Sequence, residues 1–202
     1  EKKIKVAILG SFTLNGLEET IRVKCSNKKI QCSTYVTGYN QYNQEILNEK
    51  SGLYKFSSDV TFLIIDTRSV LGKLFFNPYS ISAEDRKQFI KTKSGEIINL
   101  VKIFVNKTKS KLILSNFVIP TYSPYEINEA REEFGLQDMV RALNQNIKIE
   151  LGQDPKIYLH DLNSFITKFG ENNVFDYKQF FYGDVKISLS HIPYLAEEFM
   201  GY

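Results

Sequence analysis

The chain has 202 residues, of which 43% are hydrophobic and 24% charged, the composition of an ordinary globular domain. Its 26 basic and 23 acidic residues give a net charge of +3, which is too balanced to indicate nucleic-acid binding, because such binding needs clustered basic charge. Two cysteines and two histidines argue against a disulfide framework and against a structural zinc site. The longest apolar runs have the length of strands, so we expect no segment that spans a membrane and no membrane contact. We also expect no metal. With few cysteines and no visible signal peptide, we expect a cytoplasmic location.

Five short apolar runs follow one another along the chain. They are residues 4–9, 31–36, 60–66, 111–118 and 156–162. The first, third and fourth are almost continuous in Val, Ile, Leu and Phe, which is the pattern of strands that are buried on both faces. We therefore expect five strands.

The stretches between these runs have helical periodicity. Residues 84–106 and 125–147 carry apolar side chains at three- and four-residue steps, which predicts two amphipathic helices. After the first run, Asn15 and Glu18 have the spacing of a capping box, which predicts a helix start at that point. Residues 187–199 predict a loop and a last helix that returns over the sheet.

Strands that alternate with helices predict a parallel sheet with helices on both faces. For this length we expect a three-layer, flavodoxin-like α/β fold with five strands in the order 2-1-3-4-5. One domain is expected to cover residues 1–202.

Ligands bind such folds at the carboxyl ends of the strands, beside the switch in strand order. That rule selects the polar residues and glycines that follow the predicted strands. They are Ser11, Gly38, Asn40, Asp66, Arg68 and Asn116.

Ser11 has two interpretations. As a nucleophile it needs a base, and His191 lies in a carboxyl-terminal loop that can fold back over the strand ends. The backbone N–H of Ser11, with Gly38 and Asn40, would then stabilise an oxyanion. Alternatively, Ser11 only ends the strand. The other histidine, His160, lies inside a predicted strand and is expected in the core.

Arg68 also has two interpretations. Its guanidinium offers a fork of donors that suits a phosphate or a carboxylate. Alternatively, it forms an ion pair with Asp66 or a similar neighbour and holds a loop in place. Tyr39 follows the second predicted strand and flanks the crevice, where it would either line an acyl or pantetheine channel or pack.

Several phrases resemble the amino-terminal domain of FkbH-like proteins. They include "KVAILGSFTLNGLEETIRVK", "VTFLIIDTRSVLG" and "NFVIPTYSPY", and the match extends over nearly the whole chain. That domain is similar to SGNH hydrolases, whose serine follows the first strand, as Ser11 does here. In the family, a phosphatase-like domain of the haloacid-dehalogenase superfamily (subfamily IIIC) comes next. Such proteins place a glyceryl unit on the phosphopantetheine arm of an acyl carrier protein in polyketide-type biosynthesis.

The chain departs from these patterns in three places. The Asp-x-Asp signature of the phosphatase domain does not occur, so we expect this to be the amino-terminal part of a longer two-domain protein. Where SGNH hydrolases have an asparagine after the third strand, the chain has "IDTRS". Their last block is Asp-x-x-His, whereas Asp184 precedes His191 by seven positions and Ile187 stands where the histidine would be.

Three functions follow from the resemblance. The leading one is acyl transfer without a cofactor, in which Ser11 takes a glyceryl or similar acyl unit and exchanges it with the carrier protein. The alternative is a non-catalytic domain that docks the phosphatase-like domain and the carrier protein, which the altered third and last blocks favour. A free-standing esterase is the third.

Overall fold

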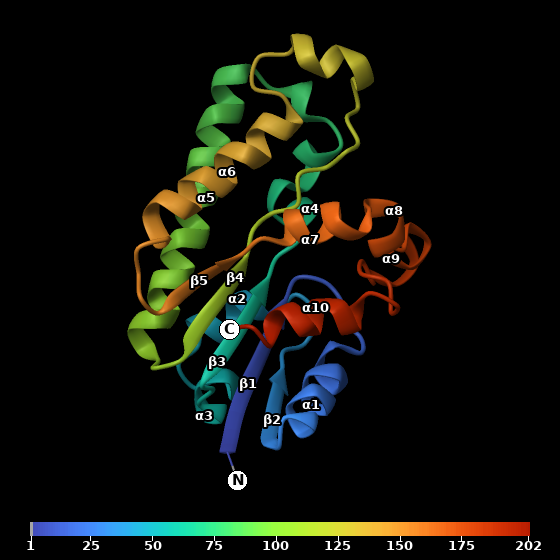
Figure 1. Ribbon diagram of the computed structural model, residues 1–202. Helices are drawn as coiled ribbons and strands as arrows, with labels where there is room; N and C mark the ends of the chain where they lie inside the picture. Colours follow the sequence, from blue (N-terminus) through green and yellow to red (C-terminus); the bar gives the residue numbers. More distant parts are fainter. Residues whose placement is uncertain (1) are drawn as a thin grey trace.

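The computed structural model describes residues 2–202, and five parallel strands form its central sheet in the order β2-β1-β3-β4-β5 (Figure 1). The strands are β1 (Lys2–Gly10), β2 (Ile30–Val36), β3 (Val60–Ile64), β4 (Lys111–Ser115) and β5 (Ile157–His160). All four pairings are parallel, so the carboxyl ends of the strands lie along one edge of the sheet. The predicted fold class and strand order are confirmed.

Helices cover both faces of the sheet. One layer consists of α2 (Tyr42–Leu47), α3 (Gly52–Phe56), α5 (Ala83–Lys107) and α6 (Leu136–Leu151). The other contains α1 (Leu17–Asn27), α7 (Leu162–Phe169), α8 (Glu171–Val174) and α10 (Ile192–Phe199). The short elements α4 (Thr67–Leu71), η1 (Gly72–Phe75), η2 (Pro78–Ser80), η3 (Glu126–Arg131) and α9 (Tyr177–Gly183) lie in the connections.

Each central strand contributes to two cores, which explains its continuous apolar sequence. In β1, Val6 and Ile8 belong to the core under α1, α7 and α10, whereas Ala7 and Leu9 belong to the core under α5 and α6. Successive residues of a strand point to opposite faces, and helices cover both faces, so all four side chains are buried.

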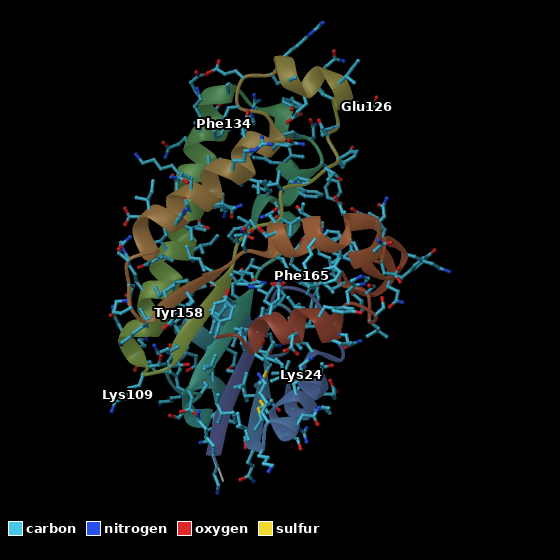
Figure 2. All side chains as sticks on the ribbon, viewed as in Figure 1. Lys24, Lys109, Glu126, Phe134, Tyr158 and Phe165 are labelled. Carbon is cyan, nitrogen blue, oxygen red and sulfur yellow. The ribbon has the colours of Figure 1, made fainter. Side chains whose placement is uncertain are left out.

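The helix predicted at residues 84–106 is confirmed as α5, but the one predicted at 125–147 is wrong in its first half. Residues Glu126–Arg131 form η3, and α6 begins only at Leu136. Glu126 and Phe134 both have positive φ, 46° and 55°, a conformation that no helix interior accommodates. Figure 2 places both residues at the end of the molecule where η3 lies, and the predicted apolar position Ile127 is 88% exposed.

The capping box predicted from Asn15 and Glu18 is also wrong. The residue that precedes α1 is Gly16, which has φ 83° and makes no side-chain cap. Glu18 instead accepts a hydrogen bond from the Thr34 hydroxyl on β2. A glycine tolerates this left-handed backbone at low cost, so the chain turns at Gly16 without the cap.

The predicted return of the last helix over the sheet is confirmed. Phe199 of α10 stacks on Phe62 of β3 with ring centroids 4.1 Å apart, and it contacts His160 edge-on at 5.0 Å. Within residues 2–202, no helix is both long enough and apolar enough to cross a membrane.

His160 lies in this core, as the sequence predicts, and is 3% exposed. Its Nδ1 is 3.2 Å from the Tyr202 hydroxyl, and its Nε2 is 3.7 Å from a Glu198 carboxylate oxygen. Burial disfavours the charged ring and lowers the pKa of His160 from 6.5 to about 4.

This buried histidine predicts a pH-dependent stability. Because the folded protein binds the His160 proton less tightly than the unfolded chain, the stability present above pH 6.5 is lost progressively as the pH falls toward 4. The loss attributable to His160 is expected to reach roughly 3 kcal/mol at most. The measurement is the free energy of unfolding of wild type and His160→Phe by denaturant titration from pH 7.5 to 4.5.

The difference between the two proteins isolates His160, because the carboxyl groups titrate in both. The variant should lose less stability than the wild type over this range. Parallel curves would contradict the assignment.

Candidate functional site

Ser11 lies directly after β1, at the point where β1 adjoins β3. Its backbone N–H donates to the carbonyl of Ile64 at 3.1 Å, and its Oγ accepts a hydrogen bond from the N–H of Asp66 at 2.7 Å. The residue is only 1% exposed. The structure therefore places Ser11 at the predicted strand end, with its hydroxyl held against the end of β3.

Asp66 connects this serine to two cations. Its carboxylate accepts from the backbone N–H of Arg68 at 3.0 Å, which caps α4, and forms an ion pair with Lys186. The Asp66 side chain is 2% exposed and that of Lys186 is 12% exposed. A buried carboxylate is tolerated only when it is paired and hydrogen-bonded, and Asp66 is both.

Arg68 completes the ion-pair network that begins at Asp66. Its guanidinium pairs with Asp184, lies 3.9 Å from the Asp66 carboxylate through Nε, and stacks over the Phe180 ring at 4.2 Å. Asp184 also accepts a hydrogen bond from Tyr39, and this bond, with partial burial, raises the pKa of the Tyr39 hydroxyl. The ion pair between Asp66 and Arg68, one of the two interpretations from the sequence, is thus present. We call Tyr39, Asp66, Arg68, Asp184 and Lys186 the Asp66 network.

The segment 183–187 brings Asp184 and Lys186 to the crevice. It runs beside the residues that follow β1, where Thr13 donates its backbone N–H to the Asp184 carbonyl at 3.0 Å and forms an isolated parallel bridge with Val185. The segment is therefore fixed to the same strand end that presents Ser11. The sequence draws attention to Asp184 only through its spacing from His191, and it gives no sign that Lys186 belongs to the site.

His191 has other neighbours. Its Nδ1 is 2.9 Å from the Ser188 hydroxyl and 3.1 Å from the Ser190 hydroxyl. Its ring contacts Phe169 and Tyr194 at centroid distances of 5.5 and 5.9 Å. Within residues 2–202, the hydrogen-bond partners of Ser11 differ from the hydrogen-bond and ring contacts of His191. A role for His191 as the base therefore stays a prediction.

The remaining predicted residues divide between two places. Gly38 lines a cavity of about 330 Å³ between the ends of β1 and β2, together with Gly10 and Tyr39. Asn40 is exposed nearby, at φ 52°.

Asn116 lies at the end of β4 and bonds to residues after β5. Its Nδ2 donates to Asp161 at 2.7 Å, and its Oδ1 accepts from the N–H of Asn163 at 3.3 Å. The structure thus joins Ser11, Asp66 and Arg68, sets Gly38 beside them, and gives Asn116 separate partners.

A larger cavity of about 530 Å³ opens beside the Asp66 network. It is lined by residues 66–68 and 75–76 after β3, by 118 and 120–122 after β4, and by side chains of the segment 171–186. Lys109, labelled in Figure 2, lies before β4 and thus at the opposite edge of the sheet from this cavity, so it does not belong to the site.

Comparison with protein families identifies the chain. The family described as "FkbH, N-terminal domain" matches residues 5–201. The chain belongs to this family. The resemblance drawn from its motifs is confirmed, whereas no curated protein sequence matches the chain.

One solved structure with the same fold contains a phosphatase domain. The N-terminal part of the protein BF1531 from Bacteroides fragilis, which contains a phosphatase domain complexed with Mg, matches with a TM-score of 0.83 at 18% identity. The match covers 98% of this FkbH N-terminal domain and 51% of that chain, so the domain spans about half of its length. In that protein the domain is joined to a phosphatase domain.

Esterases share the fold more distantly. A putative GDSL-like lipase from Parabacteroides merdae has a TM-score of 0.61 at 12% identity, with 100% and 95% of the two chains covered. A variant of the acetylxylan esterase Axe2 from Geobacillus stearothermophilus has 0.56 at 13%, with 98% and 92% covered. At these identities the likeness shows a hydrolase-like fold alone.

The ion pair between Asp66 and Lys186 is expected to stabilise the FkbH N-terminal domain. Lys186→Met leaves the buried carboxylate without its main counter-ion, which should cost about 3 kcal/mol of unfolding free energy. Asp66→Asn leaves Lys186 unpaired and should cost a similar amount. The double variant should recover part of the loss, because neither charge then remains buried alone.

Denaturant unfolding of the four proteins measures this coupling. Lys24→Met is the matched control, since Lys24 pairs with Glu197, whose side chain is 62% exposed. Such an exposed pair contributes at most about 1 kcal/mol. Equal effects of the two lysine substitutions would show that the network does not stabilise the fold.

Proposed function

We propose that this FkbH N-terminal domain binds an acyl group carried on an acyl carrier protein and positions it for a phosphatase-like domain, without forming an acyl-enzyme at Ser11. The observation that carries the proposal is the environment of the Ser11 hydroxyl. It is 1% exposed and accepts a hydrogen bond from Asp66, whose carboxylate is locked in an ion pair with Lys186.

A serine nucleophile needs a base within hydrogen-bond reach and space for the carbonyl that it attacks. In this domain Ser11 bonds to Ile64 and Asp66 at the end of β3, and Thr13, two positions further on, pairs with the segment 183–187. His191 bonds to Ser188 and Ser190. The Ser11 hydroxyl is instead bound by the backbone N–H of Asp66. The geometry therefore supports binding better than covalent catalysis.

The cavity beside the Asp66 network supplies a place for the bound group. Its volume of about 530 Å³ lies in the range of ligand sites in proteins. The net charge of +3 suits an acidic partner such as a carrier protein.

Acyl transfer through Ser11 is the second candidate. The observation that favours it is the position of Ser11 at the carboxyl end of β1, where the strand order reverses between β2 and β3. Ligands of open α/β sheets bind at this point. In that mechanism Ser11 would take the acyl group as an ester, and His191 would accept its proton.

Labelling with a serine-reactive fluorophosphonate separates the two candidates. We expect the intact mass of the wild-type domain to stay unchanged, as for Ser11→Ala, because the hydroxyl is buried and its hydrogen bond among residues 2–202 comes from a backbone N–H rather than a base. An active esterase under the same conditions is the positive control. A single adduct that is lost in both Ser11→Ala and His191→Ala, with both variants folded, would establish acyl transfer instead.

Carrier-protein binding tests the proposal directly. Isothermal titration with a carrier protein in its apo, holo and acylated holo forms should give the tightest binding for the acylated form, by about tenfold or more over the apo form. Arg68→Ala should reduce this preference, whereas Arg22→Ala should not, because Arg22 lies on the exposed face of α1. Equal affinity for all three forms would contradict positioning of the acyl group.

A further inference from the structure

The chemistry of the cavity walls is predominantly aromatic. Seven rings line it, from residues after β3, from the loop after β4 and from the segment around α9: Phe75, Phe76, Tyr122, Phe175, Tyr177, Phe180 and Phe181. Val118 and Pro120 add apolar surface from the loop after β4. Transfer of an apolar ligand from water into such a lining is favourable, so it lowers the free energy of binding.

Several of these rings lie at the mouth and remain open to solvent. Phe181 is 68% exposed, Tyr122 is 56% exposed and Phe76 is 53% exposed. They come from three different connections, so a concave apolar surface is built by segments that are far apart in the sequence. Contiguous exposed apolar surface of this kind marks an interaction site.

The charged residues of the cavity are compensated within the protein. Two acids and two bases line it, and Asp66 pairs with Lys186 while Arg68 pairs with Asp184. Glu171 accepts a hydrogen bond from the Tyr177 hydroxyl, and burial together with this bond raises the pKa of Tyr177. An anionic ligand would have to compete with Asp66 or Asp184 for the cations.

The cations are also covered by aromatic rings. The Arg68 guanidinium lies 4.2 Å from the Phe180 centroid, and the Lys186 ammonium lies 4.8 Å from that of Phe175. Among the recorded side-chain hydrogen bonds of residues 2–202, Arg68 uses only Nη2, on Asp184. Its other N–H groups are of a type that can donate to a neutral carbonyl oxygen.

From this combination we infer that the cavity binds an uncharged apolar chain, an acyl or aryl group in thioester, ester or amide linkage. The walls contact the chain, and Arg68 donates to the linkage carbonyl. Free carboxylates and phosphorylated small molecules bind poorly, and a glyceryl group, which carries two hydroxyls, gains little from aromatic walls. The inference deepens the proposed function and rests on it, since the chain would be the acyl group that the carrier protein presents.

Isothermal titration with hexanamide tests the ligand class. The amide is uncharged and inert to hydrolysis, hexanoate is its charged counterpart, and 2,3-dihydroxypropanamide is its polar one. We expect hexanamide to bind at least about tenfold more tightly than either, because only it combines an apolar chain with no charge. Tighter or equal binding of hexanoate or of the dihydroxy amide would overturn the inference.

Two neighbouring residues of α9 provide matched variants. Phe181→Asp places a carboxylate at the cavity mouth and should weaken hexanamide binding about tenfold or more. Tyr182→Asp adds the same charge next to it, at a side chain that is 87% exposed and does not line the cavity, and should leave binding unchanged. Both positions are exposed, so both variants should fold. Equal loss in the two variants would place the ligand elsewhere.

The outcomes also separate this inference from the proposed function. If acylated carrier protein binds and hexanamide does not, the ligand class is wrong and the positioning role stands. If hexanamide binds with the expected selectivity and the carrier protein shows no preference for its acylated form, the apolar cavity stands and the positioning role fails.

Discussion

The buried carboxylate of Asp66 is the point on which the carboxyl end of the sheet depends. The backbone N–H of Asp66 donates a hydrogen bond to the Ser11 hydroxyl. Its carboxylate caps α4 and forms an ion pair with Lys186. Two charges removed from water carry a large desolvation penalty, which is offset only when geometry and hydrogen bonds are favourable. The strand end after β3, the residues after β1 and the segment 183–187 must therefore meet in one arrangement.

This constraint also shapes the neighbouring cavity. The two cations of the Asp66 network are paired with its two carboxylates. The cavity beside it is therefore lined mainly by aromatic and aliphatic groups and has no uncompensated charge from the network. Phe180 contributes to both features, since it lines the cavity and covers Arg68. The same residues thus organise the carboxyl edge of the sheet and one wall of the cavity beside it.

The sequence predicts the sheet well because its signal is local. Each strand is an apolar run, and alternation with helices predicts a parallel sheet, for which this chain length favours the order 2-1-3-4-5. It also predicts that Ser11, Asp66 and Arg68 lie together, since parallel strands end at one edge. The helix prediction fails at residues 125–135, where Phe134 adopts a positive φ that its residue type does not predict.

Lys186 leaves no such signal. Its partner Asp66 is 120 positions away, and the path of the segment 183–187 is set by its pairing with Thr13. For the same reason, no local pattern in the sequence indicates that aromatic side chains of α9 line a cavity. Sites formed by long-range pairing become visible only when the connections are placed in space.

The pairing of Thr13 with the segment 183–187 has a consequence for the order of folding. The hydrogen bond from the Thr13 hydroxyl to Gly183 joins residues 170 positions apart, and such contacts form late because a long loop must close first. During synthesis Asp66 emerges 120 positions before its partner Lys186. We therefore expect the crevice beside Ser11 to gain the segment 183–187 only in the last steps of folding.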